Sequence, residues 1–205
     1  MDRLIREGVQ PISSPDLMRR LILFPIVHTS VDLGSLSESV RDHYLKRFGP
    51  SAWNQREEIV GRIWNDIQEK IDVLDIDYRK ARVYQDGLPE CGFEQQIVRE
   101  LAEAGSRNHQ LVLSLIQKGA TLMGTEDPQL LIQEYQLQQR SKDAIHSDRG
   151  KTEEAARLLA ARDRFLVKRI DETLQAGEIG LLFLGAAHRL DTLSSIDIRV
   201  ERLMS

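Results

Sequence analysis

The stretch GLLFLGAAHRLD, residues 180–191, decides the fold of this chain. Four consecutive apolar residues, 181–184, are followed by three small residues, 185–187, and then by His188. A short apolar run that ends at turn residues is typical of a strand buried on both faces. The small residues predict a tight turn, and histidine at that point is better suited to binding than to packing. The sequence therefore predicts a buried strand that presents His188 to a ligand.

Further segments with strand or helix patterns alternate along the chain. Short apolar runs or alternating apolar residues predict strands at residues 21–29, 72–85, 120–124, 179–184 and 196–200. Helical spacing, caps and glycine or proline breaks predict helices at residues 36–48, 52–70, 93–118, 129–139 and 152–176, with breaks at Gly49 and near Gly105. This order predicts one α/β domain over residues 1–205, with a sheet core flanked by long helices. We expect the sheet to be mixed rather than purely parallel.

The composition narrows the class of protein. The chain has 205 residues, 41% of them hydrophobic, and a net charge of −4. This balance argues against nucleic-acid binding, which usually needs a basic face. The longest apolar run, residues 21–27, is too short to span a bilayer, and the charged start of the chain is unlike a signal peptide. With Cys91 as its single cysteine, the sequence fits the reducing cytoplasm.

Residues that can carry chemistry follow three of the predicted strands. His28 follows the first strand, Glu126 follows the strand at 120–124, and His188 follows the strand at 179–184. Ligands of open α/β sheets bind beyond the carboxyl ends of the strands, so these side chains are expected to converge. Two histidines and a carboxylate can bind a divalent metal with open positions, or act as acid and base without one. Zinc, manganese, iron and cobalt all suit such a site.

Each of these residues also has a structural alternative. A histidine after a strand more often caps or packs than binds a ligand. Glu126 can stabilise the start of the helix that begins near Pro128, because a carboxylate is favoured at a helix N-terminus. Asp77 is expected on the solvated face of a strand, and Asp86 in a turn with Gly87.

Residues 185–188, GAAH, resemble the GxxH motif of the TraB/TIKI group. The preceding segment, residues 161–170 with the sequence ARDRFLVKRI, is similar to the charged helix before that group's last GxxH motif. Residues 25–28, PIVH, correspond to the group's first motif, with proline in place of glycine. The resemblance implies the fold shared by the TIKI proteins, the ChaN-like haem-binding proteins and the erythromycin esterases. It also implies an acidic residue after an early strand, for which Asp75 and Asp77 are the candidates.

Two functional hypotheses follow. The first is a hydrolase, metal-dependent in one version, that acts on a small molecule or a peptide. Its expected catalytic residues are His28, His188, Glu126 and Arg164, and Arg162 is the alternative to Arg164. Its expected metal ligands are His28, His188, Glu126 and Asp77. The second hypothesis is a non-catalytic binding or regulatory protein, with haem as the less favoured cofactor and a histidine as its axial ligand.

The sequence also predicts a loop and an edge strand at the surface. Residues 140–151 are polar and lack an apolar period, which predicts a mobile loop that flanks the site. The predicted strand at 196–200 offers an edge for pairing between copies of the chain, so a homo-oligomer is expected.

Overall fold

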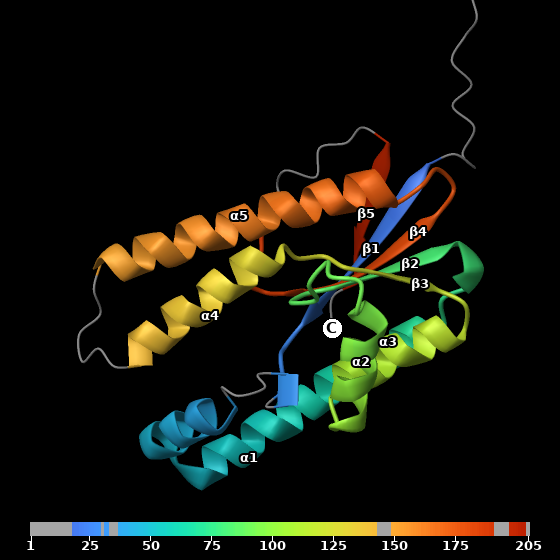
Figure 1. The fold of residues 1–205 in the computed structure, drawn as a ribbon. Coiled ribbons are helices and arrows are strands. Elements are labelled where there is room, and N and C mark those ends of the chain that lie inside the picture. Colours follow the sequence, from blue (N-terminus) through green and yellow to red (C-terminus); the bar gives the residue numbers. More distant parts are fainter. Residues whose placement is uncertain (1–17, 30, 33–36, 143–148, 191–196, 204–205) are drawn as a thin grey trace, which may run out of the picture.

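A five-stranded sheet forms the centre of the molecule (Figure 1). The computed structural model describes residues 18–29, 31–32, 37–142, 149–190 and 197–203. The strands are β1 (Arg19–Ile26), β2 (Ala81–Gln85), β3 (Thr121–Met123), β4 (Ile179–Gly185) and β5 (Ile198–Arg202). Their spatial order is β3-β2-β4-β1-β5, so β4 lies in the middle of the sheet and β5 at one edge.

All strand pairings among the described residues are parallel. The α/β class with flanking helices is confirmed, but the expectation of a mixed sheet is wrong. The reason lies in the connections, because helices join β1 to β2, β2 to β3 and β3 to β4. A helical crossover returns the chain to the same edge of the sheet and so makes successive strands parallel. The carboxyl ends of the strands therefore all lie along one side of the sheet, which we call the carboxyl edge; the opposite side, where the strands begin, is the amino edge.

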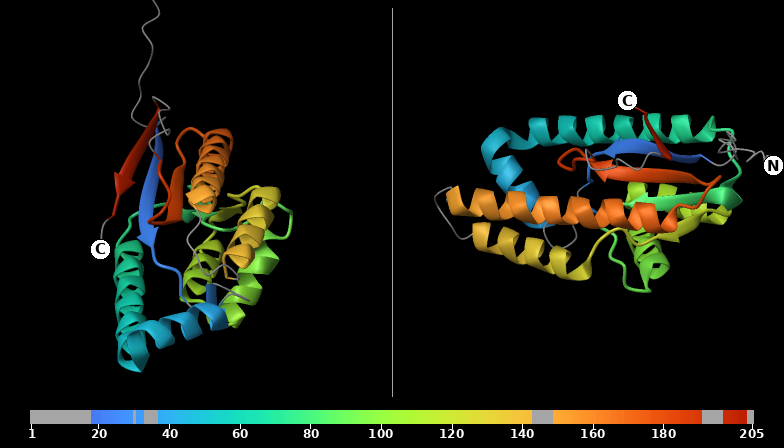
Figure 2. Two further views of the ribbon diagram at one scale, coloured as in Figure 1. Left: turned by 90° about the vertical axis from the view of Figure 1, so that its left-hand side faces the viewer. Right: turned by 90° about the horizontal axis from the view of Figure 1, so that it is seen from above.

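Helices cover both faces of the sheet (Figure 2). The helices α1 (Ser37–Asp72), α2 (Glu94–Glu103) and α3 (Arg107–Gln117) lie on one side. The other side carries α5 (Arg149–Thr173), with α4 (Pro128–Lys142) packed against it. None of the helices in the described part of the chain is long and apolar enough to cross a membrane.

Alternate residues of the central strands supply two hydrophobic cores. In β1, Ile22 and Phe24 pack toward α1 and α3, whereas Leu21 and Leu23 pack toward α5. Phe24 stacks on Phe183 of β4, with 5.1 Å between the ring centroids. Burial on both faces explains why the sequences of β1 and β4 read as continuous apolar runs.

Glycines end or bend the helices where the sequence predicts breaks. Gly49, with φ 82° and ψ 170°, interrupts α1 just before Pro50. Gly105, with φ 95°, separates α2 from α3. These values of φ lie in the left-handed region that favours glycine. The break at Gly49 folds the first arm of α1 back across the end of the molecule (Figure 2).

The strand expected at residues 72–85 is much shorter in the structure. Only Ala81–Gln85 pairs with its neighbours, and a 3₁₀ helix, η3 (Tyr78–Lys80), precedes it. The carboxylate of Asp77 caps η3 by accepting a hydrogen bond from the backbone N–H of Arg79. The alternating apolar residues before it, Leu74 and Ile76, pack partly buried against the core without strand pairing. Alternation thus reflected packing rather than a strand.

Both ends of the polar segment at residues 140–151 are helical. Arg140 belongs to α4 and α5 begins at Arg149, while residues 143–148 lie outside the described residues. Arg140 forms an ion pair with Glu154, which joins the two helices.

Candidate functional site

Four adjacent strands deliver one ionisable side chain each to the carboxyl edge of the sheet. Glu126 follows β3, Asp86 follows β2, His188 follows β4 and His28 follows β1. Because the strands are parallel, these four residues come together although the chain separates them widely. The sequence-based expectation that His28 and His188 converge is confirmed, since both imidazoles contact the same carboxylate.

Asp86 is the centre of this cluster. Its carboxylate is buried, and its Oδ2 atom accepts a hydrogen bond of 2.9 Å from the backbone N–H of Gly185. Oδ2 also lies 3.5 Å from Nε2 of His28, and Oδ1 lies 3.3 Å from Nε2 of His188 and 3.0 Å from Nη2 of Arg162. Burial alone would raise the pKa of Asp86, but its contacts with the two histidines lower it overall. Asp86 is therefore an ionised carboxylate held between two histidines and an arginine.

Position 185 has no room for a side chain, because the carboxylate of Asp86 lies against it. A Cβ atom at Gly185 would lie 2.8 Å from Oδ2 of Asp86 and 3.5 Å from Nε2 of His28. Its φ is not in the left-handed region, so the requirement is for space and not for an unusual backbone angle. The small residue at the end of β4 thus lets two strand ends and the loop after β1 approach one another.

His188 is fixed by carboxylates on both sides of its ring. Nδ1 lies 2.7 Å from Oδ1 of Asp163, and Nε2 faces Asp86. Asp163 also accepts a hydrogen bond from the backbone N–H of Arg189, which secures the turn after β4. Burial tends to lower the pKa of His188, but the hydrogen bonds and charges of Asp86 and Asp163 raise it to about 9. His188 therefore carries a proton on each nitrogen at neutral pH.

His28 is the more accessible of the two histidines. Its side chain is 39% exposed, whereas that of His188 is 4% exposed. The hydrogen bond to Asp86 raises the pKa of His28, and burial opposes this only in part. A solvent-facing imidazole that is paired with a buried carboxylate can exchange protons with a bound molecule.

Arg162 of α5 binds the acidic residues together. Its guanidinium donates two hydrogen bonds to the carboxylate of Glu126, at 3.1 and 2.7 Å, one to Asp86 and one to Glu134. Burial tends to lower the pKa of Arg162, but these carboxylates raise it overall. The pKa of Glu126 is raised, because its complete burial outweighs the contact with Arg162. The site therefore holds one arginine against several buried acids.

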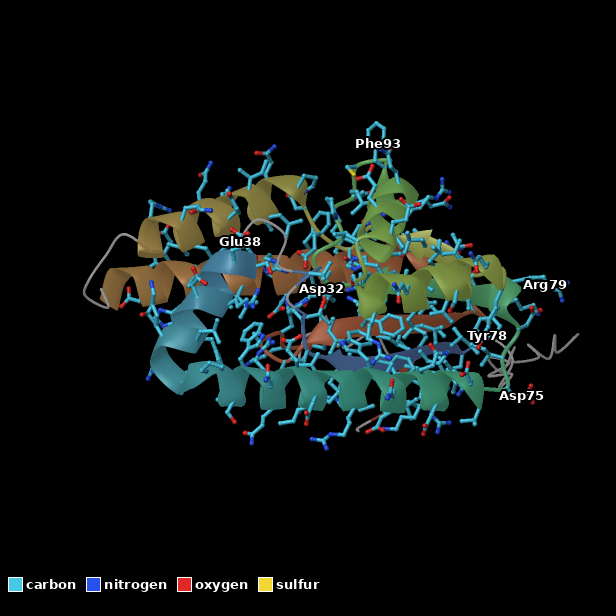
Figure 3. All side chains as sticks on the ribbon, turned by 90° about the horizontal axis from the view of Figure 1, so that it is seen from below. Asp32, Glu38, Asp75, Tyr78, Arg79 and Phe93 are labelled. Carbon is cyan, nitrogen blue, oxygen red and sulfur yellow. The ribbon has the colours of Figure 1, made fainter. Side chains whose placement is uncertain are left out.

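A second buried carboxylate, Asp32, fixes the loop that follows His28. It accepts hydrogen bonds from the backbone N–H and the hydroxyl of Thr29, and a short one from the hydroxyl of Ser106. Nδ1 of His109 lies 2.7 Å from that hydroxyl. Ser106 caps α3, so this cluster joins the loop after β1 to the start of a helix. Figure 3 shows Asp32 near the centre of the view, beside the first arm of α1.

The structure brings together three of the residues predicted for the site, His28, His188 and Glu126, and leaves two outside it. Asp77 lies at the amino end of β2, the opposite edge of the sheet. Its neighbours Asp75 and Arg79 mark that end in Figure 3, far from Asp32. Arg164 is exposed on α5, because its side chain leaves the helix on a different face from that of Arg162.

Two acidic residues of the site were missed as site residues. Asp86 was interpreted as a turn residue, and it does precede a turn at Gly87 with φ 76°. Its place directly after a strand was the signal for a second role. Asp163 was seen only as part of a charged helix. The helix-capping role considered for Glu126 belongs to its neighbour, since Asp127 accepts a hydrogen bond from the backbone N–H of Gln129.

The residues of the site include a donor set for a metal ion. One ligand atom from each of Asp86, Glu126 and His188 lies within 4.8 Å of the others. Nε2 of His28 adds a second nitrogen beside Asp86. Nδ1 of His188 faces Asp163, which matches the outer carboxylates that orient histidine ligands. Two histidines and a carboxylate are also the donors of many catalytic zinc sites.

Comparisons of the chain with protein-family models, with curated proteins and with solved structures gave no match. The geometry at the carboxyl edge of the sheet is therefore the basis for a functional assignment.

Proposed function

We propose that the chain is a hydrolase whose reaction takes place beside His28, at the carboxyl edge of the sheet. One observation carries the proposal: two imidazole Nε2 atoms flank the two oxygens of one buried carboxylate, at 3.5 and 3.3 Å. Perturbed ionisable groups gather at catalytic sites because burial and charge tune them for proton transfer. Only His28 of this trio is substantially exposed, so it is the group that reaches a substrate.

The three residues have different roles in this proposal. Asp86 orients His28 and keeps it basic through their hydrogen bond, so that the unprotonated imidazole accepts a proton from an attacking water molecule. His188 remains protonated between Asp86 and Asp163 and supplies a fixed positive charge. Arg162 supplies a second fixed charge. Preorganised cations of this kind stabilise an oxyanion in a site from which water is excluded.

A divalent metal fits the same donors. His28, His188 and Asp86 would hold it, and when bound it would lower the pKa of a water molecule and polarise a carbonyl group. Glu126 is the weaker candidate ligand, because both of its oxygens accept hydrogen bonds from Arg162. Manganese, cobalt, zinc and iron are the metals to test.

The resemblance to the TraB/TIKI group supports the same proposal. Its two histidine motifs correspond to the residues after β1 and β4, which meet at Asp86. We assign the acidic residue that the resemblance implies after an early strand to Asp86, in place of Asp75 or Asp77, because Asp86 contacts both histidines. The substrate remains a small molecule or a peptide with a hydrolysable acyl group.

One feature favours a non-catalytic alternative. Arg162 neutralises Asp86 and Glu126 from inside the protein, as in a structural charge network. On this alternative the chain is a binding or regulatory protein, and the histidines bind a ligand such as haem without catalysing a reaction.

The experiment combines metal analysis with a hydrolysis screen. The purified protein would be assayed for bound metal, for the Soret absorbance of haem, and for hydrolysis of 4-nitrophenyl esters and peptide anilides with and without a chelator. We expect His28→Gln to lower the rate at least 100-fold while its thermal unfolding stays near that of the wild type. Arg164→Gln, on the exposed face of α5, is the control and should keep full activity.

Each outcome separates the alternatives. Activity that a chelator abolishes and an added metal restores supports the metal-dependent version. Activity that survives metal removal supports acid–base catalysis by the side chains alone. Equal rates for His28→Gln and the wild type would contradict the proposal, and a Soret band without hydrolysis would favour the haem-binding alternative.

A further inference from the structure

A largely apolar hollow of about 290 Å³ opens at Val27, the residue before His28, between the end of β1 and the two arms of α1. We name it the kink hollow. Its apolar lining comes from both arms of α1 and from the residue before His28: Val27, Tyr44, Ala52, Ile59, Val60 and Ile63. The break at Gly49 creates it, because the bend brings Tyr44 of the first arm to within 5.5 Å of Trp53 of the second arm, measured between ring centroids.

The kink hollow is joined rigidly to the candidate site. Val27 lines it and is bonded directly to His28. Arg56 also lines it and donates a hydrogen bond of 3.2 Å to the carbonyl oxygen of His28. The indole N–H of Trp64 donates a bond of equal length to the carbonyl oxygen of Val27. A group seated in the hollow would therefore have a fixed position relative to the backbone that carries His28.

The exposed part of the lining is mostly apolar, with Gln55 as an exposed polar residue. Ile59 is 49% exposed and Val27 is 38% exposed. Val40 and Phe48, on the first arm of α1, are also exposed. Contiguous exposed apolar surface marks ligand-binding or interaction sites more often than scattered single residues do. The aliphatic character of the walls suits a flexible hydrocarbon chain.

From this geometry we infer that the kink hollow holds the acyl chain of the substrate, an ester or amide of a medium-chain carboxylic acid. The inference rests on the proposed hydrolase function. A volume of about 290 Å³ accommodates at most about ten carbon atoms, given that a water-sized group occupies roughly 30 Å³. Water adds to the acyl carbon as His28 takes its proton, the bond to the leaving oxygen or nitrogen breaks, and that atom receives the proton. The products are the carboxylic acid and an alcohol or amine.

The test uses the acid product, so that binding can be measured without catalysis. Acetate, butanoate, hexanoate and octanoate would be titrated into the wild-type protein by calorimetry. We expect the affinity to rise about threefold for each methylene that enters the hollow. Ile59→Asn should weaken octanoate binding at least tenfold. Ile132→Asn is the matched control, because Ile132 on α4 is 48% exposed and lies outside the hollow, and it should bind octanoate as the wild type does.

A parallel assay with 4-nitrophenyl acetate, hexanoate and octanoate separates this inference from the proposed function. Hydrolysis without any preference for the longer chains would overturn the acyl-chain inference and leave the hydrolase proposal standing. Chain-length-dependent binding that Ile59→Asn weakens, in a protein that hydrolyses no ester or amide, would overturn the hydrolase proposal and leave the subsite as a ligand-binding site. Absence of carboxylate binding to the wild type, or equal weakening by Ile59→Asn and Ile132→Asn, would overturn the subsite.

Discussion

Two buried arginines, one at each edge of the sheet, face different surroundings. Arg19, in β1 at the amino edge, pairs with Asp171 and Asp197 at 2.8 and 2.7 Å, and both carboxylates are more than half exposed. Arg162 at the carboxyl edge pairs with Asp86 and Glu126, which are almost completely buried. Solvent can stabilise the carboxylates at the amino edge, whereas those at the carboxyl edge depend on protein cations.

The surroundings of the two arginines differ in their histidines: among the described residues, His28 and His188 lie at the carboxyl edge, beside Asp86. Asp86 and Glu126 are buried acids that pair with Arg162, and Asp163 is a third buried acid that pairs with His188. Because Arg162 cannot balance them alone, His188 is held in its charged form between two of them. The carboxyl edge therefore carries buried ionisable groups that pair with one another, whereas the amino edge is held by ion pairs whose carboxylates water reaches.

The largest expected effect comes from removing each arginine in turn. Arg162→Met leaves Asp86 and Glu126 buried without their strongest partner, so we expect the free energy of unfolding to fall by about 3–5 kcal/mol. Arg19→Met should cost clearly less, about 1–2 kcal/mol, because its partners can turn to solvent. Urea unfolding at pH 7 measures both. A larger loss of stability for Arg19→Met than for Arg162→Met would contradict the idea that the buried carboxylates of the carboxyl edge depend more strongly on their arginine.

The next effect is a dependence of stability on pH that comes from His188. Its pKa rises from an ordinary value of 6.5 to about 9 on folding. A raised pKa gives stability that is complete below pH 6.5 and is lost as the pH rises through about 9. We expect this contribution to be about 2–3 kcal/mol. Urea unfolding of the wild type and of His188→Gln at pH 6, 7.5 and 9 measures it.

Removing His188 should flatten this profile. The variant should lose most stability at pH 6 and least at pH 9, while His28→Gln, at the more exposed histidine, should keep most of the slope. Parallel profiles for the wild type and His188→Gln would show that His188 is not charged in the folded protein.

A smaller effect is expected for a methyl group at Gly185. Gly185→Ala places Cβ against Oδ2 of Asp86, so we expect a loss of about 1–3 kcal/mol together with reduced hydrolysis. Gly61→Ala is the control, because the nearest atom, Nη1 of Arg107, is 3.6 Å from the added Cβ. In the middle of α1 that change should be neutral or stabilising by about 0.5–1 kcal/mol. Thermal unfolding compares the two, and equal behaviour would contradict the close approach at Gly185.

The smallest effect is expected for Asp77, at the amino edge. Asp77→Asn should leave the urea midpoint and any hydrolysis close to wild type, because the residue caps an exposed 3₁₀ turn away from His28. Loss of metal or activity in this variant would restore the hypothesis that Asp77 belongs to the site. The control is Asp86→Asn, which should abolish hydrolysis.

Local pattern was sufficient for most of the secondary structure. The apolar runs of β1 and β4 and the breaks at Gly49 and Gly105 follow from side-chain burial and from backbone angles that glycine favours. Residues 72–80 show where prediction of a strand from alternating apolar residues fails. Their alternation arises because Leu74, Ile76 and Tyr78 pack on the core, and alternation alone cannot tell that packing from strand pairing.

The sequence by itself determined which residues end the strands, and hence that His28, Glu126 and His188 were candidates for one site. It could not choose among the acidic residues or between Arg162 and Arg164, because that choice depends on strand order and on the rotation of α5. Only the tertiary structure placed β4 between β2 and β1, so that Asp86 meets both histidines. The physical reason is that strand neighbours and helix rotation are set by long-range burial, which no local segment encodes.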